Sequence, residues 1–185
     1  MSIVKTEYDK NYFENYFYKE IPNSQRNRNR LKELMIHKEK GKLLEIGCAE
    51  GHFLREARTF FEVDGIEFSE YAVNKARKYL GENVLEGDIE NIQLERHFYD
   101  AIVVFNILEH LKDPMKTIEK LYDSLQDEGI LIGSVPNNFG IIGGLATQIS
   151  NIIDKTHLST YPTEIWWNHF KKAGFSQVFF SVKYP

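Results

Sequence analysis

Four acidic residues lie in or downstream of one glycine-bearing stretch at residues 43–51, where they could act on a single ligand: Glu45, Glu50, Glu67 and Asp88. Glu67 follows Gly47 by about 20 residues, the spacing at which an acidic residue commonly accepts hydrogen bonds from ribose hydroxyls. Asp88 could accept a hydrogen bond from an adenine amino group, with Ile89 packing on the ring. Several negative charges around one loop suit a nucleoside that itself carries positive charge.

The loop argues against two common nucleotide sites. A dinucleotide site needs G-x-G-x-x-G, but counting from Gly47 places Ala49 at the second position and His52 at the third. Histidine cannot allow the close helix–strand packing that the third glycine serves, and Glu50 places negative charge where a pyrophosphate would lie. The chain has no Gly-Lys-Ser/Thr, which excludes a P-loop. S-adenosylmethionine, an adenosine with an ammonium and a sulfonium group, fits these residues.

Two histidines are candidates for a general base. Methyl transfer is a direct displacement at a carbon that the sulfonium already activates, so a base is needed only where the acceptor carries a proton. His110 follows an expected strand, and His157 follows an inserted segment that should face the same cleft. Each has an equally weighted structural alternative: a helix-entry residue that bonds the backbone for His110, and a residue that orders its loop for His157.

The elements that must position these residues alternate along the chain. Short apolar runs predict six strands: 43–46, 63–67, 83–86, 101–105, 130–135 and 177–182. Apolar residues at spacings of three and four predict helices: 8–18, 24–38, 52–61, 69–80, 113–125 and 160–174. Ser24 and Ser69 are expected N-caps, and Pro114 stands at a first helical position. Repeated strand–helix units predict an α/β fold with a Rossmann-like, doubly wound, mostly parallel sheet flanked by helices.

The bulk composition narrows the class of protein. The 185 residues are 42% hydrophobic and 27% charged, which is ordinary for a soluble globular domain. A net charge of −4 argues against a nucleic-acid partner, and the arginines at 26, 28 and 30 alternate, which predicts a solvated surface rather than a phosphate site. The single cysteine, Cys48, is expected to pack in the core and fits a reducing compartment. With no signal-peptide pattern and no long apolar run, we expect a cytoplasmic protein with no membrane span.

The sequence resembles the class I S-adenosylmethionine-dependent methyltransferases, especially the type 11/type 23-like small-molecule group. The order and spacing of the matching segments carry the resemblance, which covers about residues 40–180: 44–51 (Leu-Glu-Ile-Gly-Cys-Ala-Glu-Gly), 65–69, 87–90, 99–104, 108–114, 129–131, 154–157, 161–162 and 173–175. Two departures stand out. Ala49 replaces the commonest middle glycine, and the family's seventh strand is lacking.

The resemblance implies a role for each matching residue. Residues that would bind the cofactor, in chain order, are Glu45, Gly47, Cys48, Ala49, Gly51, Glu67, Phe68, Asp88, Ile89 and Asn106. Among them Glu45, Gly47 and Gly51 would hold the methionine part, Phe68 would lie beside the adenine, and Asn106 would lie near the methionyl end. Relatives that bind magnesium use E-x-x-E-H, whose first carboxylate is replaced here by Asn106, so no metal is expected.

These inferences predict a domain plan and a function. We expect an N-terminal helical cap over 1–40 and a Rossmann-like cofactor-binding domain over 41–185, with 137–161 as a lid or substrate insertion. The function is transfer of a methyl group to an O, N or C atom of a small molecule, with S-adenosylhomocysteine as product. The apolar segment 141–153 and the aromatic N-terminus indicate an apolar or amphipathic acceptor. The chain would act as a monomer or homodimer. The alternative is a catalytically silent protein that keeps the methyltransferase fold and either binds S-adenosylmethionine or S-adenosylhomocysteine or serves as a scaffold.

Overall fold

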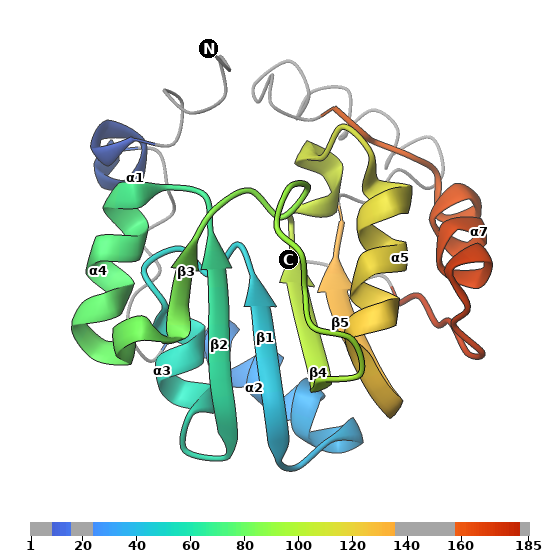
Figure 1. Cartoon of the computed structure of the whole chain (residues 1–185), viewed down its shortest axis with the longest axis horizontal. Coiled ribbons are helices and arrows are strands. Elements are labelled where there is room, and N and C mark those ends of the chain that lie inside the picture. The colour runs from blue at the N-terminus through green and yellow to red at the C-terminus, as the bar shows by residue number, and fades with distance from the viewer. Residues whose placement is uncertain (1–8, 16–23, 136–157, 182–185) are drawn as a thin grey trace.

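A computed structural model describes residues 9–15, 24–135 and 158–181 of the chain (Figure 1). Its strands are β1 Gly41–Ile46, β2 Phe61–Glu67, β3 Val84–Glu86, β4 Tyr99–Phe105 and β5 Leu125–Ser134. Its α-helices are α1 Lys10–Asn15, α2 Gln25–His37, α3 His52–Ala57, α4 Glu70–Leu80, α5 Pro114–Ser124 and α7 Thr163–Ala173. Two short 3-10 helices, η2 Gly81–Asn83 and η3 Leu108–His110, complete the described elements.

The five strands form one sheet in the order β3-β2-β1-β4-β5, and every neighbouring pair is parallel. The chain therefore runs from β1 outward to β3 on one side and returns to place β4 and β5 on the other. The strand order reverses between β1 and β4, and ligands of open α/β sheets bind at this point, beyond the carboxyl ends of the strands. The doubly wound, Rossmann-like sheet predicted from the sequence is confirmed.

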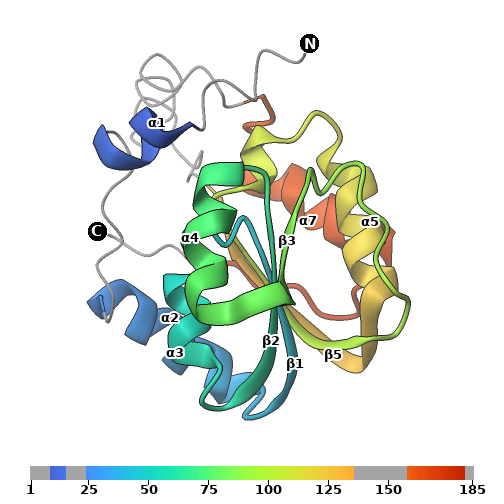
Figure 2. The same ribbon diagram turned by 60° about the vertical axis from the view of Figure 1, so that its left-hand side comes forward.

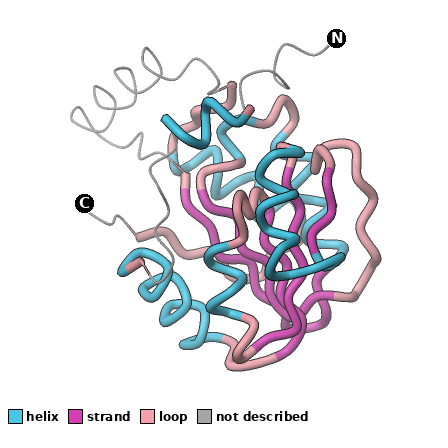
Figure 3. Tube along the Cα trace, turned by 90° about the vertical axis from the view of Figure 1, so that its left-hand side faces the viewer, coloured by secondary structure: helices cyan, strands magenta, loops and turns pink. Residues whose placement is uncertain are grey.

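Helices cover both faces of the sheet (Figures 2 and 3). On one face, Leu43 and Val103 pack with Leu34 of α2, Phe53 of α3 and Val73 of α4. On the opposite face, side chains from the central strands pack with α5 and with the tryptophan of α7: Leu44, Ile46, Ile102, Val104, Ile118, Leu121 and Trp166. Because β1 and β4 are buried on both faces, apolar residues follow one another directly in them, as in Leu43-Leu44 and in residues 101–105, and do not alternate with polar ones.

The expected helix starts are confirmed by their caps. The Ser24 Oγ accepts a hydrogen bond from the Asn27 N–H at 3.1 Å, and the Ser69 Oγ accepts one from Ala72 at 3.4 Å. Asp113 caps α5 through its Oδ1, and Pro114 occupies the first helical turn, where its missing N–H costs nothing. These side chains satisfy N–H groups that a helix leaves without intrahelical partners, and so fix where each helix begins.

Several boundaries differ from the sequence prediction, and the strand predicted at 130–135 already begins at Leu125. The predicted strand at 177–182 is wrong over the described residues 177–181, which adopt no regular structure, and Phe179 is 86% exposed there. The Phe180 ring instead lies 6.3 Å from that of Phe170, so the segment packs on α7 and not along β5. The helix predicted over 52–61 ends at Ala57, because Phe61 is already paired with Gly41 at the start of β2.

Because residues 177–181 form no strand, one edge of β5 is left unpaired in the described structure. Within the described part of the chain no strand pairs with its outer side, and its residues 129–132 are only half-buried.

Of the helices that the structure describes, none is long and apolar enough to cross a bilayer.

Two adjacent tryptophans of α7 provide a test of how this helix packs against the sheet. Trp166 is 2% exposed within the core, whereas Trp167 is 41% exposed. We expect Trp166→Ala to lower the free energy of unfolding by about 3–5 kcal/mol, the usual cost of emptying a large core position. Trp167→Ala should cost less than about 1 kcal/mol. Urea unfolding followed by circular dichroism measures both, and equal losses would contradict the packing described.

Candidate functional site

The carboxyl edge of the sheet gathers the loops that carry the predicted site residues. The loop after β1 holds residues 47–51, the one after β2 follows Glu67, the last residue of that strand, the one after β3 holds Asp88 and Ile89, and the turn after β4 holds Asn106 and His110. Since the strands are parallel, all four loops leave the sheet at the same edge, around the reversal of strand order between β1 and β4. Of the predicted residues only His157 lies outside the described ones.

The loop after β1 is held open by left-handed backbone. Gly47, Ala49 and Gly51 have φ values of +70°, +48° and +75°. A Cβ at Gly51 would lie 2.7 Å from the Leu80 Cδ1, so only glycine lets the start of α3 approach α4 this closely. Ala49 adopts the same region with a side chain, which is uncommon outside glycine, asparagine and aspartate. The alternation of left-handed residues turns the backbone toward the carboxyl edge, as a ligand-binding loop requires.

Glu67 fastens this loop to the next one. Its Oε2 accepts a hydrogen bond from the Ala49 N–H at 2.9 Å, and its Oε1 accepts one from the Ser69 N–H at 2.8 Å. The residue is 8% exposed, and burial raises the pKa of its carboxyl group, while the nearby backbone N–H groups of Ser69, Ala49 and Phe68 act in the opposite direction. An ionised carboxylate offers about four acceptor positions, so two backbone bonds leave capacity for the hydroxyls of a ligand.

Cys48 and Glu45 lie beneath the loop. Cys48 is 2% exposed, and a Cβ at Gly65 would lie 2.7 Å from its Sγ, so the thiol packs against β2. Only the backbone of Cys48 can therefore meet a ligand. Glu45 is 5% exposed within β1, next to Gly65 and Val103 in the sheet. The missing side chain of Gly65 leaves space for the sulfur that a larger residue would fill.

The loop after β3 is built around Asp88. Its Oδ1 accepts from the Glu90 N–H and its Oδ2 from the Asn91 Nδ2, each at 2.9 Å. The Gly87 N–H donates to the Glu67 carbonyl oxygen at 2.9 Å, which places this loop beside the second one. Ile89 is 5% exposed and packs in the core on the α5 face. The Asp88 carboxylate thus shapes its own turn, with acceptor capacity left for a further donor.

The turn after β4 faces the glycine loop. Asn106 has φ +54°, its N–H donates to the Ser134 carbonyl at 2.9 Å, and its Oδ1 accepts from the Ser134 Oγ at 2.9 Å. This left-handed residue turns the chain so that the Ile107 side chain lies against Gly47, in the space that a Cβ there would need. Asparagine tolerates the left-handed region better than most residues, which explains its place here.

His110 closes this turn as the last residue of η3. Its N–H donates to the Ile107 carbonyl at 2.9 Å, and its side chain is half-buried. The N–H groups of Leu158 and Ser159 both donate to the Glu109 carbonyl at 2.8 Å, and the Ser159 Oγ donates to the Leu111 carbonyl at 2.8 Å. The chain that returns from the segment 137–157 is therefore tied directly to the turn that carries His110.

Two residues of α2 were missed in the sequence. The Arg30 guanidinium stacks over the Phe105 ring, 4.1 Å from its centroid, so the prediction of a solvated surface is wrong for this arginine. Asn27 is completely buried, and its side-chain nitrogen and oxygen have no hydrogen-bond partner among the residues that the structure describes. Lys38, at the other end of α2, lies near the amino ends of the strands, so Asn27 lies toward the carboxyl edge. Asn27 precedes Leu34 by seven residues, which places both on the buried side of the helix; this spacing was the signal in the sequence.

The aromatic N-terminus also reaches the loop. Phe13 of α1 is 7% exposed and packs with Ala49 and with Ala72 of α4, and its ring lies 6.0 Å from that of Tyr71. Figure 1 shows α1 beside the first turn of α4. The methyl group that distinguishes Ala49 from the commoner glycine is therefore part of this contact. The prediction of a helix docked on the domain is confirmed for residues 10–15.

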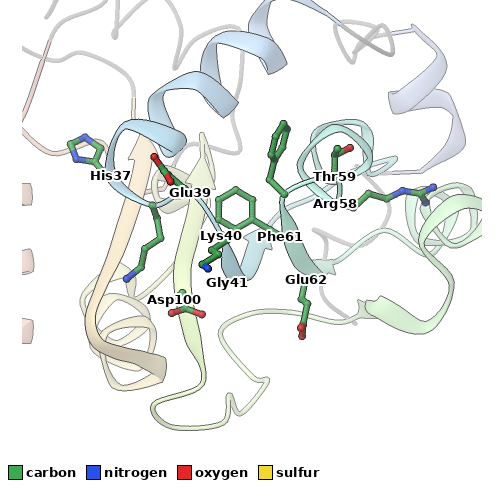
Figure 4. Close-up of a pocket in the computed structure, with 11 residues that line it drawn as sticks. His37, Glu39, Lys40, Gly41, Arg58, Thr59, Phe61, Glu62 and Asp100 are labelled. Atoms are coloured by element: carbon green, nitrogen blue, oxygen red, sulfur yellow. The ribbon is translucent and has the colours of Figure 1, made fainter.

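A hollow of about 780 Å³ lies at the opposite edge of the sheet (Figure 4). It is lined by the amino ends of β1, β2 and β4 together with the end of α2, and includes Gly41, Phe61 and Asp100. The loops that carry the predicted residues leave the other edge, and ligands of such sheets bind there, so this hollow is not the candidate site. Among the residues that the structure describes, no three His, Cys, Asp or Glu side chains are grouped to hold a metal ion.

Known proteins share this architecture and these segments. The model of a family described as "Methyltransferase domain" matches residues 12–178. The chain is 33% identical over 103 residues to the malonyl-[acyl-carrier protein] O-methyltransferase of Bacillus cytotoxicus, covering 52% of this chain and 36% of that one. It is 29% identical over 131 residues to the ubiquinone biosynthesis O-methyltransferase of an Azoarcus species, covering 63% and 55%. The chain thus spans about half, or less, of these relatives' length.

A solved structure agrees in fold. The phosphoethanolamine N-methyltransferase 2 of Haemonchus contortus, in complex with S-adenosyl-L-methionine, superimposes with a TM-score of 0.66 at 19% identity, covering 81% of this chain and 36% of that one. At this identity the likeness shows the architecture and nothing finer.

The two backbone hydrogen bonds that Glu67 accepts can be tested on the unliganded protein. Glu67→Gln leaves one side-chain oxygen for two backbone N–H donors, so one of them loses its partner inside the protein. We expect the free energy of unfolding to fall by about 1–3 kcal/mol. Glu62→Gln, on the exposed side of the same strand, is the matched control and should stay within about 0.5 kcal/mol of the parent. Equal free energies of unfolding for the two variants, measured in urea, would contradict the view that Glu67 links the loops after β1 and β2.

Proposed function

The chain belongs to the S-adenosylmethionine-dependent methyltransferases, and from this membership we propose that it transfers a methyl group to an O, N or C atom of a small-molecule acceptor. The observation that carries the proposal is the buried Glu67 carboxylate, which joins the glycine loop to the loop after β2 at the carboxyl edge. A carboxylate with spare acceptor positions at the end of the second strand suits the paired hydroxyls of a ribose.

The residues at this edge fit the parts of the cofactor. Glu67 would accept from the ribose hydroxyls, with Phe68 beside the adenine, and Asp88 and Ile89 would hold the adenine. The backbone of the 47–51 loop, where Cys48 and Ala49 contribute main-chain atoms, would lie along the methionine part, above Glu45. Asn106 would lie near its amino-acid end.

Arg30 and Asn27 extend the methionine end of the proposed site. Arg30 contributes a cation beside the end of β4, and Asn27 contributes a buried amide whose nitrogen and oxygen have no partner within the described ranges 9–15, 24–135 and 158–181. A guanidinium and an amide suit a carboxylate, because one attracts its charge and both donate hydrogen bonds to it.

The chain's own contribution to the reaction is alignment. S-adenosylmethionine supplies a methyl carbon activated by the sulfonium, which the acceptor's lone pair displaces to leave S-adenosylhomocysteine. The loops at the carboxyl edge would fix the position of this carbon and exclude water, and proximity of this kind supplies much of the rate. Where the acceptor is a hydroxyl or an ammonium group, His110 or His157 would take its proton. The N–H groups of Leu158 and Ser159, which follow His157 in sequence, both donate to the carbonyl of Glu109 beside His110.

The domain plan is part of the same proposal. Residues 1–40 would form the N-terminal helical cap, 41–185 the cofactor-binding domain, and 137–161 a lid or substrate insertion that lies largely outside the described residues. The contact of Phe13 with Ala49 supports a cap that reaches the cofactor loop. The acceptor would be apolar or amphipathic, in keeping with the apolar residues of the insertion and the aromatic residues of the cap.

Isothermal titration with S-adenosylhomocysteine tests the cofactor site. We expect the folded parent protein to bind, and Glu67→Ala and Asp88→Ala to weaken binding by about tenfold or more, since each removes a hydrogen bond to a charged group. Glu62→Ala, on the exposed side of β2, should bind within twofold of the parent. Absence of binding by the folded parent would contradict the proposal.

Turnover separates the enzyme from a silent scaffold. In the presence of S-adenosylmethionine and a panel of phenols, amines and apolar carboxylic acids, the enzyme forms S-adenosylhomocysteine, whereas a scaffold binds it and forms none. For a hydroxyl acceptor, His110→Gln should lower kcat while the affinity for S-adenosylhomocysteine stays within twofold of the parent's.

The pH dependence of binding reports on Glu67. Only the ionised carboxylate can accept from two hydroxyls, and burial raises its pKa above the ordinary value of 4.5. Affinity for S-adenosylhomocysteine is therefore complete above the raised pKa and falls as the pH is lowered through it, sooner than an ordinary glutamate would allow. Titrations at a series of falling pH values should show this fall in the parent and a flatter profile in Glu67→Gln. The same slope in both proteins would exclude Glu67 as its origin.

A further inference from the structure

We propose that Lys120 of α5 is a positioning residue for the adenine end of the site, because its ammonium group holds the loop that carries Asp88 and Ile89. The inference rests on the proposed function and adds a residue to it that touches no ligand itself. Lys120 lies in the middle of α5, outside every segment that the glycine loop and the strand ends contribute.

The contacts of Lys120 converge on three backbone carbonyls. Its Nζ donates to the carbonyl oxygens of Ile89 at 2.5 Å, Ile92 at 2.7 Å and Glu90 at 3.2 Å. An ammonium group has three protons, so these carbonyls use its whole donor capacity. Charge-assisted hydrogen bonds are about twice as strong as neutral ones, so the clamp is strong for a single side chain.

The loop depends on these hydrogen bonds because its own backbone lacks the regular hydrogen-bond pattern of a helix or strand. From Gly87 to the start of β4 at Tyr99 the backbone forms neither helix nor strand. A buried carbonyl without a partner is costly, and Lys120 supplies the partner that regular structure would otherwise give. A second link to α5 comes from its N-cap, where the Asp113 N–H donates to the Glu90 Oε1 at 2.8 Å. The loop is therefore fixed to α5 at two points.

The charges around the ammonium group are mixed. Burial lowers the pKa of Lys120, the positive charge of Lys116 lowers it further, and the carboxylates of Asp88 and Glu90 act in the opposite direction. The Asp88 carboxylate is thus near enough to interact electrostatically with the Lys120 ammonium group. Asp88 is also the residue proposed to accept a hydrogen bond from the adenine amino group. Movement of the clamped carbonyls would displace the Asp88 carboxylate, because Ile89 is the next residue along the chain.

Arginine is not an equivalent replacement. Its planar fork presents donors in one plane, whereas the ammonium group directs three protons at carbonyls that converge on one point. Lys120→Met keeps the length and apolar stem of the side chain and removes all three donors. Lys116→Met, on the exposed side of the same helix, is the matched control.

The test compares two ligands: S-adenosylhomocysteine and its 6-oxo analogue, S-inosylhomocysteine, which lacks the adenine amino group. We expect Lys120→Met to weaken S-adenosylhomocysteine binding by about tenfold and to reduce the preference for it over the analogue, while Lys116→Met leaves both within twofold. Amide hydrogen exchange at residues 88–92 should be faster in Lys120→Met, with α2 and α3 unchanged. Lys120→Arg, which keeps the charge, should also lose part of the preference.

The outcomes separate the two proposals. If the parent does not bind S-adenosylhomocysteine, the proposed function fails and the inference fails with it. If the parent binds and Lys120→Met keeps the full preference between the two ligands, or weakens both equally, Lys120 has no positioning role. A variant that unfolds is replaced in the comparison by Lys120→Arg, for which an unchanged preference likewise overturns the inference.

Discussion

One buried carboxylate holds the carboxyl edge of this sheet together. Each oxygen of Glu67 accepts a backbone N–H from a different loop, Ala49 on one side and Ser69 on the other. Burial disfavours the charge, and the backbone donors offset part of that cost. A group of this kind persists because removing a partner would leave buried N–H groups unsatisfied. The same strand end also receives the loop after β3, through the Gly87 N–H on the Glu67 carbonyl.

The remaining elements serve this edge in a physically consistent way. Left-handed residues at Gly47 and Gly51 turn the first loop, and the left-handed Asn106 turns the chain after β4 back toward it. Lys120 and the N-cap of α5 hold the third loop, while Phe13 covers the middle of the first. Each loop is thus fixed by contacts between elements far apart in sequence, which is how a rigid scaffold carries a binding site on irregular segments.

Much of the fold could be predicted from local signals, because apolar runs, serine caps and Pro114 each act over a few residues. The site residues at strand ends followed from the same reasoning, since parallel strands bring their carboxyl ends together. Arg30 and Lys120 could not be found this way: their partners, the Phe105 ring and the carbonyls after β3, are remote in sequence. The strand predicted at 177–182 failed because Phe180 packs on Phe170 of α7, a contact with another element that the local pattern does not show.

The central claim is that Glu67 both joins the loops and receives the ribose of the cofactor. A crystal structure of the chain with S-adenosylhomocysteine tests it most directly. Both ribose hydroxyls should lie within hydrogen-bond distance of the Glu67 carboxylate, with the bonds from Ala49 and Ser69 retained. A ribose bound elsewhere, or a Glu67 side chain that keeps only its backbone partners while the ligand is present, would contradict it.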